Sequence, residues 1–233
     1  MCSADNPAGQ GNAHGRVVAA FDFDGTLTRR DTLLPFLRFL CGHSAVTLTM
    51  MRYSASLSVA MALDRHARRA SIKEEVLRDL LVGRDQEDVR AAGERFGQRL
   101  VHERGGRGMR PDTLARWRWH RAQGHEIVIV SASLDAYITP FARQLGGANV
   151  LATRLSVDEG GTLTGVFDGF NCRGAEKVRR LREWGLRPEV ELWAYGNSSG
   201  DRELLTAAHM PHRVGRGVRI VTPPAQEAAR PRS

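Results

Sequence analysis

The sequence predicts an α/β fold in which an inserted all-helical cap interrupts a parallel, doubly wound sheet. Two observations lead to this prediction. Apolar strand-like runs alternate with helical segments along most of the chain, and such alternation is typical of parallel sheets. Residues 32–108 depart from it, because their pattern is helical with polar or glycine breaks and contains no strand candidate. We therefore expect a small helical cap between the first strand and the second.

The remaining elements follow in chain order. Strand-like apolar runs occur at 16–23, 125–132, 149–157, 162–167, 190–196 and, more weakly, 217–223. Helical segments lie between them at 112–123, 134–145, 175–184 and 201–208. A Gly-Gly turn between the third and fourth runs predicts a hairpin. These elements predict a core domain of residues 16–31 and 109–222, a cap of residues 32–108, and disordered ends at 1–15 and 223–233.

Charge and cysteine content narrow the class of protein. The net charge is +8, but the 34 basic residues are spread along the chain and do not form one block, so no nucleic-acid partner is expected. Cys2, Cys41 and Cys172 are too few for a disulfide framework or a zinc site, which favours a reducing cytoplasm. The first residues lack the basic and apolar regions of a signal peptide, so none is expected.

The apolar run at 45–63 raises the question of a membrane contact. Arg52 lies near its middle, where a charge costs about 2.5–3.5 kcal/mol on insertion, and five Ser or Thr residues dilute it. A buried cap helix is the favoured interpretation. Peripheral contact with a membrane surface and a spanning helix are the alternatives.

Two acids, Asp22 and Asp24, follow the first strand-like run directly. Side chains at i and i+2 of a strand point the same way, and ligands of open α/β sheets bind beyond the carboxyl ends of the strands. Two carboxylates there repel one another unless a cation lies between them, and Mg²⁺ prefers such oxygens and accompanies phosphate. Gly25 permits a tight turn that exposes backbone N–H groups to an anion. A turn that caps the next helix is the ordinary alternative.

Further polar residues follow other strand-like runs. Ser131 ends the second run just before a helical segment, where a hydroxyl and helix N-terminal amides suit a phosphate. Lys177 begins the helix at 175–184, and Asn197 and Asp201 flank a Gly/Ser turn after the run at 190–196. Each residue alone has an ordinary explanation as a cap, turn or surface residue. Their joint position at carboxyl ends of strands predicts one phosphate and metal site.

Lysine is scarce in this chain. Lys73 and Lys177 are its only lysines, so 32 of the 34 basic residues are arginine. A lysine retained inside a site suggests that a compact ammonium is required there instead of a planar guanidinium.

The stretches DFDGTLT, VIVSAS and GNSSGD, together with Lys177, resemble the four motifs of the haloacid dehalogenase superfamily of phosphatases. The match is closest to the phosphoserine-phosphatase-like branch (subfamily IB), and it spans residues 22 to 201. The resemblance implies a Rossmann-like sheet and Mg²⁺-dependent hydrolysis of a small-molecule phosphomonoester through an aspartyl-phosphate. It implies that Asp22 is the nucleophile and Asp24 the general acid and base. By the same resemblance, substrate binding falls to Gly25, Thr26, Ser131, Ala132 and Lys177, and Mg²⁺ binding to Asp22, the backbone carbonyl of Asp24, Asn197 and Asp201.

The sequence departs from the family pattern at two positions. Asn197 stands where the family usually has an aspartate, so either the affinity for Mg²⁺ falls or Asp201 supplies the anionic contact. Gly25 stands where phosphoserine phosphatases commonly have a serine, and cap residues that read phosphoserine are not recognisable. The sequence therefore gives no basis for predicting phosphoserine specificity. It also leaves the oligomeric state open.

Three other functions remain alternatives. The stretch GAEK and the apolar run at 45–63 also resemble a lipid-phosphate phosphatase of the phosphatidylglycerophosphate phosphatase type, acting at the membrane surface. Asn197 raises the alternative of a weakly catalytic binding module. A phospho-acceptor receiver domain also pairs acids with Ser or Thr and Lys, but it lacks a large helical insertion and an acid in the position of Asp24.

Overall fold

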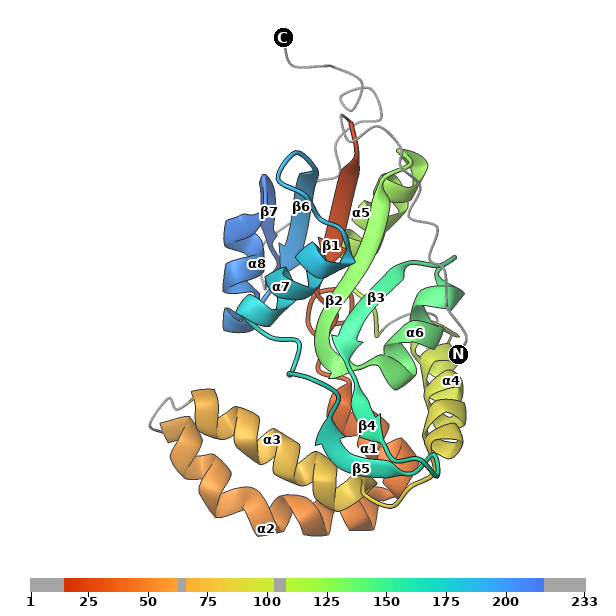
Figure 1. Cartoon of the computed structure of the whole chain (residues 1–233), viewed down its shortest axis with the longest axis vertical. Helices are drawn as coiled ribbons and strands as arrows, with labels where there is room; N and C mark the ends of the chain where they lie inside the picture. Colours follow the sequence, from red (N-terminus) through yellow and green to blue (C-terminus); the bar gives the residue numbers. More distant parts are fainter. Residues whose placement is uncertain (1–14, 63–65, 103–107, 216–233) are drawn as a thin grey trace.

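The central sheet of the computed structural model, which describes residues 15–62, 66–102 and 108–215, has five parallel strands (Figure 1). Their order across the sheet is β3-β2-β1-β6-β7. The bounds are β1 Val17–Phe21, β2 Glu126–Leu134, β3 Asn149–Thr153, β6 Glu191–Gly196 and β7 Met210–Arg213. The chain winds outward from β1 in one direction through β2 and β3, and in the other through β6 and β7. The predicted doubly wound α/β fold is therefore confirmed.

Helices cover both faces of this sheet. Successive side chains of β1 alternate between two apolar cores: Ala19 and Phe21 face one, and Val18 and Ala20 face the other. Helices α5 (Pro111–Ala122) and α6 (Asp135–Gln144) contribute to the first core, and α7 (Ala175–Trp184) and α8 (Arg202–Ala207) contribute to the second. Because both faces are buried, every strand residue from Val18 to Phe21 is apolar.

Four helices fill the segment between β1 and α5: α1 Leu33–Cys41, α2 His43–Ala62, α3 His66–Leu81 and α4 Gln86–His102. Arg52 and Tyr53 of α2 both bond to Asp79 Oδ2 of α3, each at 3.0 Å. Helix α4 lies against α6 (Figure 1), and the approach is so close that a Cβ on Gly93 would clash with the Ala136 carbonyl. The predicted boundary between cap and core, at 108/109, remains a prediction.

The run predicted as a strand at 149–157 is two strands in different sheets. It divides at Arg154 into β3 and β4 (Leu155–Val157), and β4 pairs antiparallel with β5 (Leu163–Phe167) in the predicted hairpin. The hairpin reaches the α3–α4 turn, where Leu163 exchanges backbone hydrogen bonds with Gly83 and Arg84 at 2.9 and 2.8 Å. A helical segment therefore has strand neighbours that its own sequence does not predict.

Strand β7 was missed because it is short, polar and contains Pro211, which is tolerated only at a sheet edge. The weaker strand predicted at 217–223 and the disordered ends, apart from Gly15, lie outside the described residues. Within the described part of the chain, no helix is both long and apolar enough to span a bilayer. On α2, Val46 is buried, whereas Leu48 and Met51 are mostly exposed.

Candidate active site

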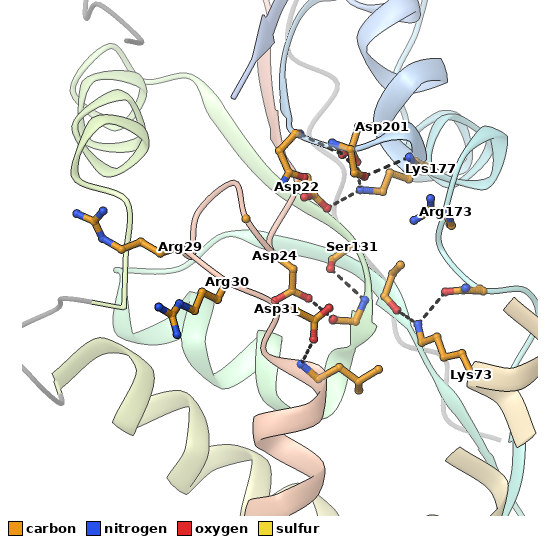
Figure 2. A pocket seen from close by; sticks show the side chains of 18 residues that line it. Asp22, Asp24, Arg29, Arg30, Asp31, Lys73, Ser131, Arg173, Lys177 and Asp201 are labelled. Atoms are coloured by element: carbon orange, nitrogen blue, oxygen red, sulfur yellow. Dashed lines mark hydrogen bonds and ion pairs between the residues drawn. The ribbon is translucent and has the colours of Figure 1, made fainter. Parts of the chain in front are cut away.

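The carboxyl ends of β1, β2 and β6 meet at one edge of the sheet, beside the start of α7, and enclose a cavity of about 540 Å³ (Figure 2). Eight of the nine side chains or backbone positions predicted for the site line it: Asp22, Asp24, Gly25, Ser131, Ala132, Lys177, Asn197 and Asp201. Thr26 is the exception. Its hydroxyl is buried and donates to Asp22 Oδ2 at 3.0 Å, so Thr26 orients the Asp22 carboxylate without lining the cavity itself.

Lys177 joins the two carboxylates that lie deepest in the cavity. Its Nζ donates to Asp22 Oδ1 and to Asp201 Oδ1, both at 2.6 Å, and its side chain is almost fully buried. Burial alone would lower the pKa of Lys177, but Asp22 and Asp201 outweigh it and raise that pKa above its usual value. The ammonium is therefore permanently charged, and it makes the proximity of the two acids tolerable.

The two carboxylates respond differently to this shared ammonium. Burial raises the pKa of Asp22, and Lys177 and Thr26 only partly oppose the shift. Burial also acts on Asp201, but Lys177 and Ser198 outweigh it and lower the pKa. The difference follows from the donors: Asp201 Oδ2 accepts hydrogen bonds from Asn197 N (3.2 Å), Ser198 N (2.9 Å) and Ser198 Oγ (2.8 Å). Asp201 is thus a fixed anion, and Asp22 is the more basic and less satisfied carboxylate.

Asp24 points toward the segment between β1 and α1. Its Oδ1 accepts from the backbone and the hydroxyl of Thr32 at 2.8 and 2.6 Å, and its Oδ2 accepts from Ser133 Oγ. Burial, followed by the charge of Asp31, raises the pKa of Asp24 to about 7. A carboxyl group with this pKa exchanges protons readily near neutral pH, which is the requirement for a general acid and base.

A bulge in β2 presents Ser131 to the cavity. Its pairing with β3 shifts register between Ser131 and Leu134, and Ser133 N donates to Ser131 Oγ at 3.1 Å. The Ser131 hydroxyl therefore accepts from the backbone and retains its own hydrogen for a ligand. The strand continues to Leu134, so α6 begins at Asp135, farther from Ser131 than the sequence suggests.

Asn197 supplies an oxygen that the protein itself leaves unsatisfied. Its Oδ1 is buried without a hydrogen-bond partner, and such an acceptor is costly unless a ligand occupies it. Gly25, at a φ of +76°, approaches so closely that a Cβ there would clash with Asn197 Nδ2. In the described residues no group of three His, Cys, Asp or Glu side chains is arranged to hold a metal ion. The amide oxygen of Asn197 and the Asp22 carboxylate nevertheless suit Mg²⁺, whereas both Asp201 oxygens are already engaged.

The structure adds residues that the motifs do not reveal. Lys73 of α3 reaches the cavity and donates to the Ala132 carbonyl at 2.6 Å, and Ser133 and Thr32 position Asp24. Asn171 and Arg173 line the same cavity from the β5–α7 loop. The scarcity of lysine was the one sequence signal that marked Lys73, since both lysines of the chain line this cavity. Cys172 is buried with its pKa raised to about 11 by burial, which keeps the thiol protonated.

The chain is similar in sequence and in fold to known hydrolases and phosphatases. The haloacid dehalogenase-like hydrolase family matches residues 19–206. Protein CicA of Caulobacter vibrioides is 39% identical over 221 residues, which cover 92% of this chain and 94% of that protein. A probable phosphatase of Mycobacterium tuberculosis is 35% identical over 91 residues, covering 38% of this chain and 31% of that one. A crystal structure of apo phosphoserine phosphatase shares the fold, with a TM-score of 0.55 at 18% identity over 83% of each chain. The chain therefore belongs to the haloacid dehalogenase-like hydrolases and has the fold of their phosphoserine-phosphatase-like members.

Proposed function

We propose that this hydrolase is a Mg²⁺-dependent phosphatase that cleaves a small-molecule phosphomonoester through an aspartyl-phosphate on Asp22. One observation carries the proposal: Asp22, bridged to Lys177, and Asp24, with a pKa near 7, open onto the same cavity. Membership of the hydrolase family and the similarity to a probable phosphatase support it.

In the first step a carboxylate oxygen of Asp22 forms a bond to phosphorus while the ester P–O bond breaks. The leaving alkoxide takes the proton of Asp24, so no unstable alkoxide is released. Lys177 would offset charge on the transferring phosphoryl group, and Ser131, Gly25 and Ala132, which line the cavity, would contact its oxygens.

In the second step Asp24, now ionised, takes a proton from a water molecule whose oxygen attacks phosphorus. The bond between phosphorus and Asp22 breaks, which releases inorganic phosphate and restores both carboxyl groups. Asp22, the backbone carbonyl of Asp24 and Asn197 would bind the Mg²⁺, and Asp201 would fix the loop that carries Asn197. When bound, the ion neutralises charge on the phosphoryl oxygens.

The test is hydrolysis of p-nitrophenyl phosphate by the purified protein with and without Mg²⁺. We expect Mg²⁺-dependent turnover that Asp22→Asn abolishes. The matched control is Asp88→Asn, which changes an exposed aspartate of α4 and should leave turnover intact. Absence of Mg²⁺-dependent turnover, or an Asp22→Asn variant as active as wild type, would refute the proposal and favour a binding module.

The exposure of Leu48 and Met51 on α2 favours a second candidate, a lipid-phosphate phosphatase at the membrane surface. This function predicts faster hydrolysis of phosphatidylglycerol phosphate in vesicles than of water-soluble glycerol 1-phosphate. Changing both residues to serine should then slow only the reaction on vesicles. Equal rates on both substrates in the wild type would exclude it.

A further inference from the structure

Three polar side chains at one wall of the cavity take no part in the proposed phosphoryl chemistry. Lys73 comes from α3, and Asn171 and Arg173 come from the β5–α7 loop (Figure 2). We call them the Lys73 cluster. Lys73 Nζ donates to the Ala132 carbonyl at 2.6 Å and to Asn171 Oδ1 at 3.3 Å, so the cluster begins beside the bulge of β2 that follows Ser131.

The amide of Asn171 is oriented by its neighbours. Its Oδ1 accepts from both Lys73 and, at 3.1 Å, the Thr153 hydroxyl. The Thr153 hydroxyl shares its single hydrogen with the Ala132 carbonyl at 3.0 Å, so Lys73 is the main donor that orients the amide, and its Nδ2 hydrogens face the other way, toward a possible acceptor. Arg173 donates to Ser199 Oγ at 3.0 Å and lies against Gly200, which leaves other guanidinium hydrogens for a ligand.

The cations of the cluster differ from Lys177 in lacking acidic partners. Lys177 is paired with two carboxylates, but among the described residues neither Lys73 nor Arg173 has a carboxylate within ion-pair distance. Burial lowers the pKa of Lys73 to about 8, and Arg173 adds to that shift, whereas Asp31, Asp24 and Glu74 oppose it. Lys73 and Arg173 are thus neighbouring cations with which no described carboxylate forms a direct ion pair, and both would stabilise an anion bound beside them.

The cluster also lies where two cavities adjoin. A second cavity, of about 560 Å³, adjoins the cluster, and its lining includes Phe170, Arg202 and the acids Glu74, Glu176 and Glu203, so the cluster is the cationic part of this region. Both cavities share Asn171, Arg173 and Gly200 as lining residues. A substrate whose phosphoryl group lies at Asp22 can therefore extend past the Lys73 cluster toward the second cavity.

We propose that the Lys73 cluster binds a second anionic group on the leaving group, so that the preferred substrates are phosphomonoesters with a carboxylate or another phosphate. This inference rests on the proposed phosphatase function and adds a specificity site to it. Lys73, Asn171 and Arg173 together supply a compact ammonium, an amide and a guanidinium, which suit the oxygens of either anion.

The test compares pairs of substrates that differ in one anionic group. 2-Phosphoglycolate is paired with ethyl phosphate to test a carboxylate, and propane-1,3-diol bisphosphate with propane-1,3-diol phosphate to test a second phosphate. We expect wild type to favour the anionic member of at least one pair by about tenfold or more in kcat/KM, the effect of a charge-assisted hydrogen bond. Whichever pair shows the preference identifies the anion.

Lys73→Met and Arg173→Met should each reduce this preference by about tenfold, through loss on the anionic member. Arg78→Met is the matched control, because it removes an exposed cation of the same helix and should leave the preference unchanged. Equal kcat/KM values within both pairs in wild type would overturn the proposal. So would variants that lose activity equally on charged and uncharged members, since that result assigns the cluster a structural role.

A binding measurement separates this inference from the phosphatase function. Calorimetry on wild type should show phosphonoacetate binding about tenfold more tightly than ethylphosphonate, and Lys73→Met should remove the difference. A binding difference without turnover of any substrate would refute the phosphatase function and support the anion site. Equal binding of the two phosphonates would refute the anion site even if p-nitrophenyl phosphate is hydrolysed.

Discussion

Replacing Lys177 by methionine should affect both the stability and the chemistry of this protein. The change removes the ammonium that lies 2.6 Å from both Asp22 and Asp201 and leaves two buried carboxylates facing one another. At an effective dielectric constant of about 20, each contact corresponds to roughly 6 kcal/mol of attraction before desolvation is subtracted. Removal of one partner from a buried pair typically costs about 3–5 kcal/mol. We therefore expect the free energy of unfolding to fall by about 3–5 kcal/mol at pH 7.

The loss should depend on pH in a defined direction. Burial already raises the pKa of Asp22, and without Lys177 nothing comparable opposes that shift. A carboxyl whose folded pKa lies above its unfolded value destabilises the protein as pH rises through that range. The deficit of Lys177→Met should therefore be smaller at pH 5 than at pH 7. Turnover should also fall, because the pKa of Asp22 rises further without Lys177 and a protonated carboxyl is not a nucleophile.

Urea unfolding followed by tryptophan fluorescence at both pH values, together with p-nitrophenyl phosphate turnover, measures these effects. Arg182→Met, an exposed change on the same helix, is the control. If Lys177→Met is too unstable to study, Lys177→Met with Asp22→Asn should recover part of the loss, since it removes the unpaired charge. A deficit below about 1 kcal/mol, or one that is equal at pH 5 and pH 7, would refute the reasoning.

Three further predictions concern the same site and the core beneath it. Asn197→Asp adds a carboxylate near Asp22, so it should lower the melting temperature of the protein without Mg²⁺. The variant should retain activity at a lower Mg²⁺ concentration and show a larger Mg²⁺-induced rise in melting temperature. A rise no larger than that of wild type would contradict this prediction. Gly25→Ala should reduce kcat/KM by at least about tenfold and lower the melting temperature. The reason is that φ at this position is +76° and the new Cβ would displace the Asn197 side chain. Unaltered turnover would count against this prediction. Burial lowers the pKa of His120 to about 2, so the unfolded chain binds the proton first and stability should fall below pH 6.5 by about 1.4 kcal/mol per pH unit. Urea midpoints at pH 7 and 5 test this, and His120→Gln should flatten the slope; the same slope in both proteins would exclude His120 as its source.

Most of the site was predictable because its residues follow strands. Asp22 follows β1, Ser131 lies at the bulge in the last part of β2, and Asn197 follows β6, so these residues come together once the three strands are parallel neighbours. The helix at 175–184 was predicted with its observed bounds, and Lys177 lies in its first turn, where it reaches the same edge. The local sequence was therefore enough to predict those site residues whose position depends only on the order and direction of the strands.

The site residues and strand boundaries that the sequence did not predict depend on contacts between segments far apart in the chain. Lys73 is 59 residues from the Ala132 carbonyl that it contacts, and nothing in the sequence of α3 specifies that approach. The division of 149–157 at Arg154 is also tertiary, because β4 leaves the sheet to pair with β5 beside α3. The metal role of Asp201 stays a prediction, and the sequence did not specify that the backbone of Asn197 and Ser198 donates to one of its oxygens. Such hydrogen bonds appear only when the turn is built.

The scarcity of lysine makes selective chemical modification of the cavity possible. An amine-selective reagent finds only Lys73 and Lys177 among its side chains, and both line the cavity that contains Asp22. The two amines differ sharply in reactivity: Lys177 is 1% exposed and paired with two acids, whereas Lys73 is partly exposed and has a pKa of about 8. Limited acylation near neutral pH should therefore favour Lys73, and a ligand bound at the Lys73 cluster should shield it. In this arginine-rich protein, a reagent with no designed specificity becomes a reporter of site occupancy.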